Sequence, residues 1–165
     1  SGLKAEKIIF GSDSSGSALA LALILLLKQE KQSLPKAAFL FSPMLDFSIS
    51  GESVTKNKDL DPKIFKEDLE LTSKYYCDKK SVKDPLVSPV YGDFTDFPPL
   101  FIQVGSEELL LSDSLTLEKR VKNTGVSVKL EVWEGMWHVF QTRFESIPEA
   151  DQAVTNAVDF INSSV

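Results

Sequence analysis

Apolar and polar residues follow two different spacings along this chain, one typical of strands and one typical of helices. Four short segments are continuously apolar or alternate between apolar and polar residues, and they are predicted strands: residues 7–10, 37–41, 100–104 and 126–133. The run 37–41 is apolar throughout, which predicts a strand buried on both faces, as in a parallel sheet. The alternation in 126–133 instead favours an outer strand with one wetter face.

Four further segments have apolar residues at helical spacing: residues 15–30, 62–76, 112–122 and 148–162. The first half of the 15–30 segment is apolar all round, so we expect a helix that is buried on most sides. Strands and helices therefore alternate along the chain, which predicts an α/β fold with a parallel sheet and right-handed crossovers.

The segment between the second and third predicted strands departs from this alternation. Residues 51–61 are polar and typical of a loop, and the helix predicted over 62–76 follows them. A connection this long between two core strands is usually functional, for example as a lid or as the wall of a binding site.

Composition and charge narrow the classes of protein. The 165 residues, 42% of them hydrophobic, are enough for one domain with its own core. A net charge of −6 argues against a surface that binds nucleic acid or an anionic membrane. The longest apolar run, residues 18–27, is shorter than the roughly 20 residues that cross a bilayer.

Cysteine and histidine usage bears on compartment and cofactors. The single cysteine, Cys77, excludes an intrachain disulfide and fits a reducing compartment, so a cytoplasmic location is expected. Since the sequence has no cluster of cysteines and histidines, we expect no metal site.

A cluster of small residues separates the first predicted strand from the first predicted helix. Strand, sharp turn and helix is the context in which a serine becomes a nucleophile. Ser14 is the candidate, because Ser12 and Gly16 stand two positions to either side, where strand and helix crowd together. The alternatives are a helix cap and a phosphate site at the helix N-terminus, although residues 11–18 lack the lysine expected of the latter.

Chemically useful side chains follow the other strands as well. Glu107 and Glu108 come after the third strand, and His138, the only histidine of the sequence, comes after the fourth. In parallel α/β sheets, ligands bind at the carboxyl ends of the strands. The order nucleophile, acid and base is that of α/β-hydrolase triads. The alternatives are a histidine packed among the loop's aromatic residues and a solvated charge at Glu107.

Together these features resemble the hormone-sensitive-lipase group of α/β-hydrolases, esterases whose nucleophile turn reads Gly-Asp-Ser-Ala-Gly-Gly. Residues 12–17 correspond to that turn, with serine in place of the first glycine, the alanine and the last glycine. The other matching segments are Ser42-Pro43, Asp84-Pro85-Leu86-Val87-Ser88-Pro89, Gly92-Asp93-Phe94, Pro98-Pro99, residues 104–113 and Gly135-x-x-His138-x-Phe140. The resemblance implies that Glu108 is the catalytic acid, where the family usually has aspartate, with Glu107 as the neighbouring alternative.

Two departures from the family pattern bear on activity. Ser12 and Ser17 add bulk at the nucleophile turn. The His-Gly-Gly motif, whose backbone N–H groups supply most of the family's oxyanion hole, is not in this sequence. Of the oxyanion donors that the resemblance implies, only the Ser15 backbone N–H is present.

In the family, the nucleophile strand pairs on one side with a strand from the first half of the domain. We therefore expect these residues to be the C-terminal half of an α/β-hydrolase, with a mostly parallel sheet, flanking helices and a partial cap insert. The core is expected over residues 1–49 and 92–165, and the insert over about 50–91. The N-terminal half of the same domain is then an expected partner, and a homodimer is left open.

The resemblance implies a serine ester hydrolase acting on short- to medium-chain carboxylic esters through an acyl-enzyme, a reaction that needs no metal or organic cofactor. Ser14 attacks the ester carbonyl, His138 serves as general base and then general acid, and Glu108 fixes the imidazole. One alternative is a catalytically idle α/β-hydrolase-like binding or interaction protein, which the changed turn favours. The other is an inactive fragment.

Overall fold

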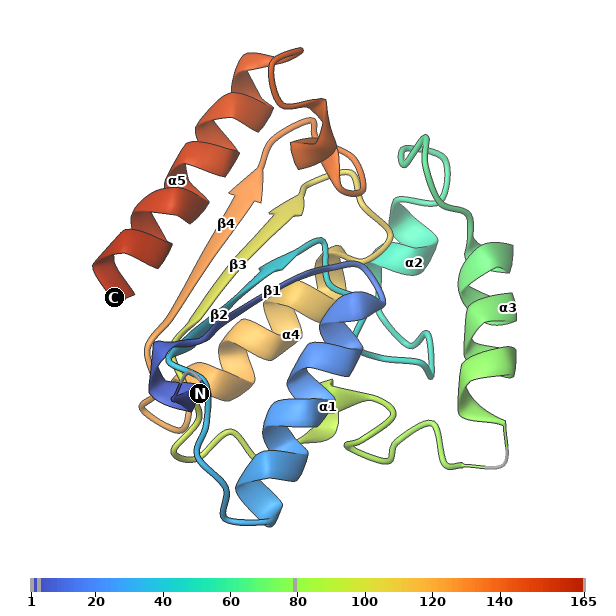
Figure 1. The fold of residues 1–165 in the computed structure, drawn as a ribbon. Coiled ribbons are helices and arrows are strands. Elements are labelled where there is room, and N and C mark those ends of the chain that lie inside the picture. The colour runs from blue at the N-terminus through green and yellow to red at the C-terminus, as the bar shows by residue number, and fades with distance from the viewer. Residues whose placement is uncertain (1, 3, 79, 165) are drawn as a thin grey trace.

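A four-stranded parallel sheet forms the centre of the protein, in the computed structural model that describes residues 2, 4–78 and 80–164 (Figure 1). Its spatial order is that of the sequence: β1 (Ile9–Asp13), β2 (Ala37–Phe41), β3 (Leu100–Gly105) and β4 (Val128–Trp133). Phe10 pairs with Ala38, Leu40 with Ile102, and Ile102 with Leu130. This register brings the carboxyl ends of all four strands to one edge of the sheet.

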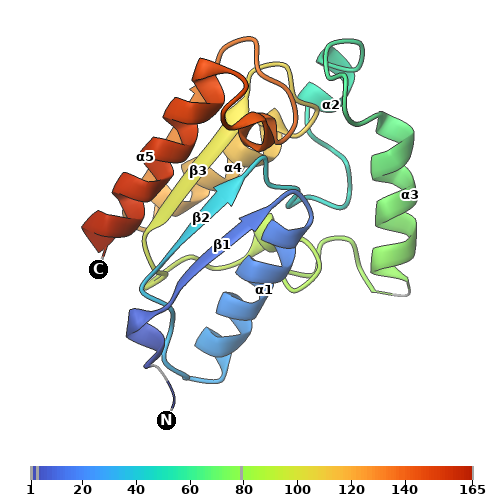
Figure 2. The ribbon, with the colours of Figure 1, turned by 45° about the horizontal axis from the view of Figure 1, so that its top comes forward.

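Helices cover both faces of the sheet. The helices are α1 (Gly16–Gln29), α2 (Ser53–Lys56), α3 (Lys66–Cys77), α4 (Leu111–Lys122) and α5 (Pro148–Ser164), with 3₁₀ turns at Ala5–Lys7, Pro89–Tyr91 and Phe140–Arg143. Figures 1 and 2 show α1 and α4 on one face and α5 on the other, while α3 stands away from the sheet. Among the described residues, no helix combines the length and apolar character that crossing a membrane requires.

The predicted α/β class and parallel sheet are confirmed, with local differences. The strand predicted at 37–41 is β2 itself, and the helix predicted over 15–30 is α1. The first strand starts later than predicted, because residues 5–7 form a 3₁₀ turn. The loop expected over 51–61 contains the short helix α2, and the helix predicted from residue 62 begins only at Lys66.

One main core lies between the sheet and the helices α1 and α4. Leu21 and Ile24 of α1 are fully buried there against Leu40 of β2 and Ile102 of β3. A second cluster joins the residues between β2 and β3 to this body: Ala18, Met44, Phe47, Val54, Leu69, Cys77, Val87, Leu109 and Leu110. The long connection is therefore packed onto the segment that follows β3, next to the carboxyl edge of the sheet.

The outer side of β1 and α1 is uncovered in the described part of the chain. β1 pairs only with β2 there, so its other edge is unpaired. Leu19 and Leu23 of α1 are 58% and 45% exposed, and with Phe10 they line a hollow beside that edge. The helix predicted to be buried on most sides is buried where it faces the sheet, and this face lacks the cover expected from the first half of the domain. An unpaired strand edge beside exposed leucines is a surface that proteins usually cover.

Candidate functional site

Ser14 occupies the turn between β1 and α1. Its φ of +47° lies in the left-handed region, which is uncommon for residues other than glycine. Its N–H donates to the Phe41 carbonyl, and its own carbonyl accepts from the N–H of Met44, both at 3.0 Å. Backbone bonds to the end of β2 therefore hold this strained turn in place.

The two serines that depart from the family turn pair with each other. The Ser12 hydroxyl donates to the Ser17 hydroxyl at 3.1 Å, and Ser17 is fully buried. A Cβ at Gly16 would meet nothing closer than 3.8 Å, at Asp13. The expectation that crowding demands a small residue at Gly16 is therefore wrong. The added hydroxyls fit the turn as a local hydrogen bond.

The structure brings Ser14, His138 and Glu108 into one hydrogen-bonded row. His138 Nε2 lies 3.0 Å from Ser14 Oγ, and His138 Nδ1 lies 3.1 Å from Glu108 Oε2. An ionised carboxylate only accepts hydrogen bonds, so the imidazole proton belongs on Nδ1 and leaves Nε2 free to accept the serine proton. These are the contacts that a serine nucleophile and its base require.

The two candidate glutamates occupy different environments. Glu108 is fully buried, and its Oε1 accepts from the Gly105 N–H and the Ser42 hydroxyl, both at 2.6 Å. Glu107 is half-buried, and its carboxylate makes no hydrogen bond or ion pair to the residues that the structure describes. Geometry therefore pairs His138 with Glu108 and leaves Glu107 aside.

The loops after β3 and β4 are joined through their backbones. The Ser106 N–H donates to the Trp133 carbonyl at 2.8 Å, and the Glu107 N–H to the Met136 carbonyl at 3.1 Å. A Cβ at Gly105 would collide with the Met136 carbonyl, so glycine permits this approach. Glu108 and His138 thus lie on two loops that are hydrogen-bonded to each other.

Asn57, from the segment between β2 and β3, also holds the loop after β3 that carries Glu108, which is called the acid loop below. The sequence alone did not indicate this role. The Asn57 side-chain amide donates to the carbonyls of Ser106 and Glu108, at 3.0 and 2.9 Å. An asparagine just after α2 has no recognisable motif, because its role depends on which loop folds against it.

The Ser15 backbone N–H is free beside Ser14. It donates to no acceptor among the described residues, whereas the Ser14 N–H before it donates to the Phe41 carbonyl. An unpaired N–H next to a nucleophile is available to an oxyanion.

As for metals, no group of three or more histidine, cysteine, aspartate or glutamate side chains in the described ranges is arranged to hold an ion.

The sequence matches a known family and several curated proteins. Residues 1–142 match the α/β hydrolase fold family. An esterase of Acinetobacter venetianus is 38% identical over 163 residues, which are 98% of this chain and 54% of that protein. An acetyl-hydrolase of Streptomyces hygroscopicus is 34% identical over 96% of this chain and 53% of its own length. The chain spans about half the length of the curated relatives it matches.

Solved structures of similar sequence have the same fold. An esterase of the bacterial hormone-sensitive lipase family superposes with a TM-score of 0.95 at 37% identity, covering 99% of this chain and 55% of that one. A hormone-sensitive lipase from a metagenome library gives a TM-score of 0.94 at 36% identity, over 98% of this chain and 55% of its own. The predicted resemblance to this group is confirmed.

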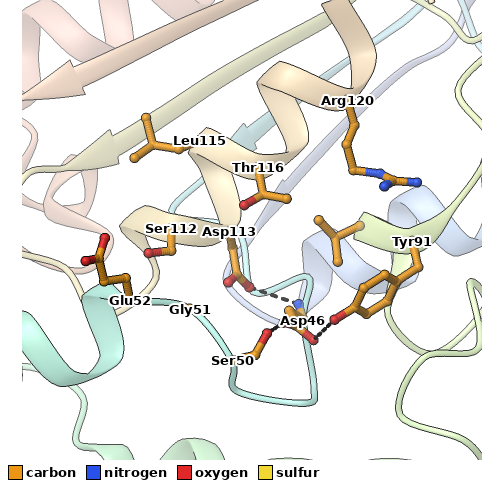
Figure 3. Close-up of a pocket in the computed structure, with 11 residues that line it drawn as sticks. Asp46, Ser50, Gly51, Glu52, Tyr91, Ser112, Asp113, Leu115, Thr116 and Arg120 are labelled. Atoms are coloured by element: carbon orange, nitrogen blue, oxygen red, sulfur yellow. Dashed lines mark hydrogen bonds between the residues drawn. The ribbon is translucent and has the colours of Figure 1, made fainter. Parts of the chain in front are cut away.

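A separate hollow of about 440 Å³ lies beside the first turn of α4 (Figure 3). None of the three side chains in the hydrogen-bonded row, Ser14, His138 and Glu108, lines it. Asp113 is buried at its wall and accepts the N–H groups of Leu45 and Asp46 at 2.7 and 2.9 Å. Burial raises the pKa of Asp113 to about 7, the two N–H donors oppose the rise, and the Asp46 charge adds to it. Burial also acts on Asp46, but the hydroxyls of Ser48, Ser50 and Tyr91 outweigh it and lower the pKa of Asp46.

Replacing Asp113 by asparagine should flatten the pH dependence of stability. Since the pKa of Asp113 is about 7 in the folded protein and near 3.8 when unfolded, the folded state holds more protons between these values. Stability from this group is therefore full below about pH 4 and falls as the pH rises to 7. Each pKa unit is worth about 1.4 kcal/mol, so the parent should lose at least about 1 kcal/mol more than Asp113→Asn between pH 4.5 and 7.5.

Urea unfolding at several pH values measures this difference. Asp113→Ala is the control, because it also removes the acceptor of two backbone N–H groups and should lower stability at every pH. Equal pH dependence in the parent and Asp113→Asn would contradict the assignment.

Proposed function

Because the chain belongs to the α/β hydrolase fold family, we propose that it carries carboxylic ester hydrolase activity, with Ser14 as nucleophile, His138 as base and Glu108 as acid. The observation that carries this proposal is the position of His138 between the other two side chains, 3.0 Å from Ser14 Oγ and 3.1 Å from Glu108 Oε2. The names of its relatives, an esterase and an acetyl-hydrolase, support it.

The proposed reaction proceeds through an acyl-enzyme. Ser14 Oγ attacks the ester carbonyl while His138 Nε2 takes its proton, and the Ser15 N–H donates to the resulting oxyanion. The tetrahedral intermediate collapses, and His138 returns the proton to the leaving alcohol. Water, deprotonated by His138, then attacks the acyl group and releases the acid. Throughout, the Glu108 carboxylate stabilises the imidazolium and fixes its orientation.

The segment over about 50–91 is proposed as a partial cap that walls the acyl pocket, with the core in residues 1–49 and 92–165. Two observations support this division. Helix α3 stands away from the sheet (Figure 2). The Asn57 side-chain amide donates to the Glu108 carbonyl and so connects the segment to the loop that carries Glu108. Short- to medium-chain carboxylic esters are the proposed substrates.

The active form is proposed to include a further segment that covers β1 and α1, equivalent to the first half of the relatives. The unpaired edge of β1 and the exposed Leu19 and Leu23 support this. A second candidate function, that of an idle binding protein, is favoured by the changed nucleophile turn and by the absence of a His-Gly-Gly motif from this sequence. Labelling with a fluorophosphonate separates the two, since it marks an activated serine and not an idle one.

Removing either end of the proton path should abolish turnover. In the intact natural protein, Ser14→Ala and His138→Ala should each lower kcat by more than about 10³-fold, and to a similar degree, because triad members act as a unit. Hydrolysis of p-nitrophenyl esters and fluorophosphonate labelling measure the effect. Ser114 is a buried serine of α4 whose hydroxyl has no hydrogen-bond partner among the described residues. Ser114→Ala is therefore the control and should retain activity. Parental activity in Ser14→Ala would overturn the nucleophile assignment.

The two glutamates should differ sharply. Glu108→Gln should cost about 10³–10⁴ in kcat, by analogy with neutralising the carboxylate of a serine-protease triad. Glu107→Gln should cost less than about tenfold, because its side chain lies aside from the imidazole. Steady-state kinetics on both variants compare them directly, and reversed magnitudes would transfer the role of acid to Glu107.

The 165 residues by themselves should hydrolyse esters slowly. Loss of one oxyanion donor costs about 10²–10³ in kcat, and of the donors that the family resemblance implies only the Ser15 N–H is in this sequence. Because the β1 edge is uncovered, the turn at Ser14 is fixed from the β2 side only and should be more mobile than in the complete domain. The test is ester hydrolysis by the purified 165-residue chain, with and without the first half of the longer protein supplied in trans. Turnover near the typical enzyme value of about 10 s⁻¹ by the chain alone would contradict this account.

A further inference from the structure

We propose that Ser42 is a positioning residue for the reaction, and that its hydroxyl fixes Glu108 and the loop of His138 relative to each other. The inference rests on the proposed function, because it assigns Ser42 a role in the same site. Ser42 follows β2, the strand between those that carry Ser14 and Glu108. Among the described residues, its hydroxyl contacts both loops at once.

The contacts of this hydroxyl are short and buried. Ser42 is fully buried, its Oγ lies 2.6 Å from Glu108 Oε1, and the Val139 N–H donates to the same Oγ at 2.9 Å. The Ser42 N–H donates to the Gln103 carbonyl at 2.7 Å, which fixes its backbone to β3. The residue therefore has little freedom to move away from either loop.

Chemistry determines the direction of both hydrogen bonds. An amide N–H can only donate, so Ser42 Oγ accepts from Val139. An ionised carboxylate can only accept, so the Ser42 proton points to Glu108 Oε1. The Ser42 hydroxyl thus links the backbone next to His138 to the Glu108 carboxylate. Only one orientation of its O–H bond satisfies both partners.

This link restrains each side of the pair formed by His138 and Glu108. On the acid side, Ser42 and Gly105 saturate Oε1, so that Oε2 is directed at the imidazole. On the base side, Val139 directly follows His138 and has a φ of +51°, which is strained for a β-branched residue. The hydrogen bond that the Val139 N–H donates to Ser42 Oγ holds Val139 in that conformation, and it thereby restrains the orientation of the His138 imidazole.

A merely structural role makes different predictions, and the chain offers a matched control. Ser88 is also fully buried, donates to the Val82 carbonyl at 2.5 Å and accepts from the Phe47 N–H at 2.9 Å. It therefore has the same pattern of one donated and one accepted bond, but contacts none of the three aligned side chains. Ser42 itself has a φ of +49°, so Ser42→Gly keeps the backbone favourable while removing the hydroxyl, whereas Ser42→Ala removes only the hydroxyl.

The experiment measures kinetics and the imidazole proton in the intact natural protein. Ser42→Ala and Ser42→Gly should each lower kcat by about 10- to 100-fold, with KM changed less than threefold, because misplaced catalytic groups affect the reaction more than binding. The Nδ1–H signal, observed after ¹⁵N-histidine labelling and assigned by its loss in His138→Ala, should move upfield or broaden in both variants. Ser88→Ala should keep the signal position, because the bonds that it removes do not reach His138 or Glu108.

Several outcomes would overturn the proposal. Parental kcat and an unchanged signal in both Ser42 variants would remove its role. Full activity in Ser42→Gly alone would show that the backbone conformation matters and the hydroxyl does not. An equal change of the imidazole signal in Ser88→Ala, or unfolding of both Ser42 variants, would assign Ser42 to the stability of the fold. If instead Ser14→Ala retains activity, the proposed function fails, while the imidazole signal still tests the link from Ser42 through Glu108 to His138.

Discussion

A carboxylate with no exposed surface, that of Glu108, lies just after β3, and the surrounding loops are arranged to satisfy it. A buried charge is costly unless hydrogen bonds or an opposite charge compensate for it. Here the compensation comes from a backbone N–H at Gly105, a hydroxyl at Ser42 and the imidazole of His138. Each donor belongs to a different part of the carboxyl edge of the sheet, so a well-placed Glu108 also requires that β2, β3 and the loop after β4 be in register.

The parallel sheet makes this convergence geometrically simple. Because all strand ends reach the same edge, the residues that follow β1, β2, β3 and β4 bring their side chains together there. The site then depends on unusual backbone at a few residues: Ser14, Ser42 and Val139 all have positive φ, and Gly105 lacks the Cβ that would block the neighbouring loop. Local strain of this kind persists only where the surrounding structure compensates for it.

The other side of the molecule has a different character. β1 carries the nucleophile candidate and yet has one unpaired edge within the described ranges, beside the exposed leucines of α1. The relatives are about twice as long as the matched chain. The well-packed half of the site, formed by Glu108 and His138, thus adjoins an open half at Ser14, where the turn is fixed from the β2 side only.

The sequence by itself determined the α/β class, the limits of β2, the helix that is α1, and Ser14 and His138 as two of the side chains that converge, because hydrophobic spacing and residue order are local properties of the chain. It placed the acid at Glu108 by family resemblance but could not separate it from Glu107 by pattern, since adjacent residues share every local signal. Only the tertiary structure decided which carboxylate is buried against His138, that Ser42 and Asn57 hold the acid loop, and that the raised pKa belongs to Asp113. Those outcomes depend on which loops come into contact across 30 to 100 residues of sequence, and on how completely water is excluded between them, and neither is written in the spacing of residues along the chain.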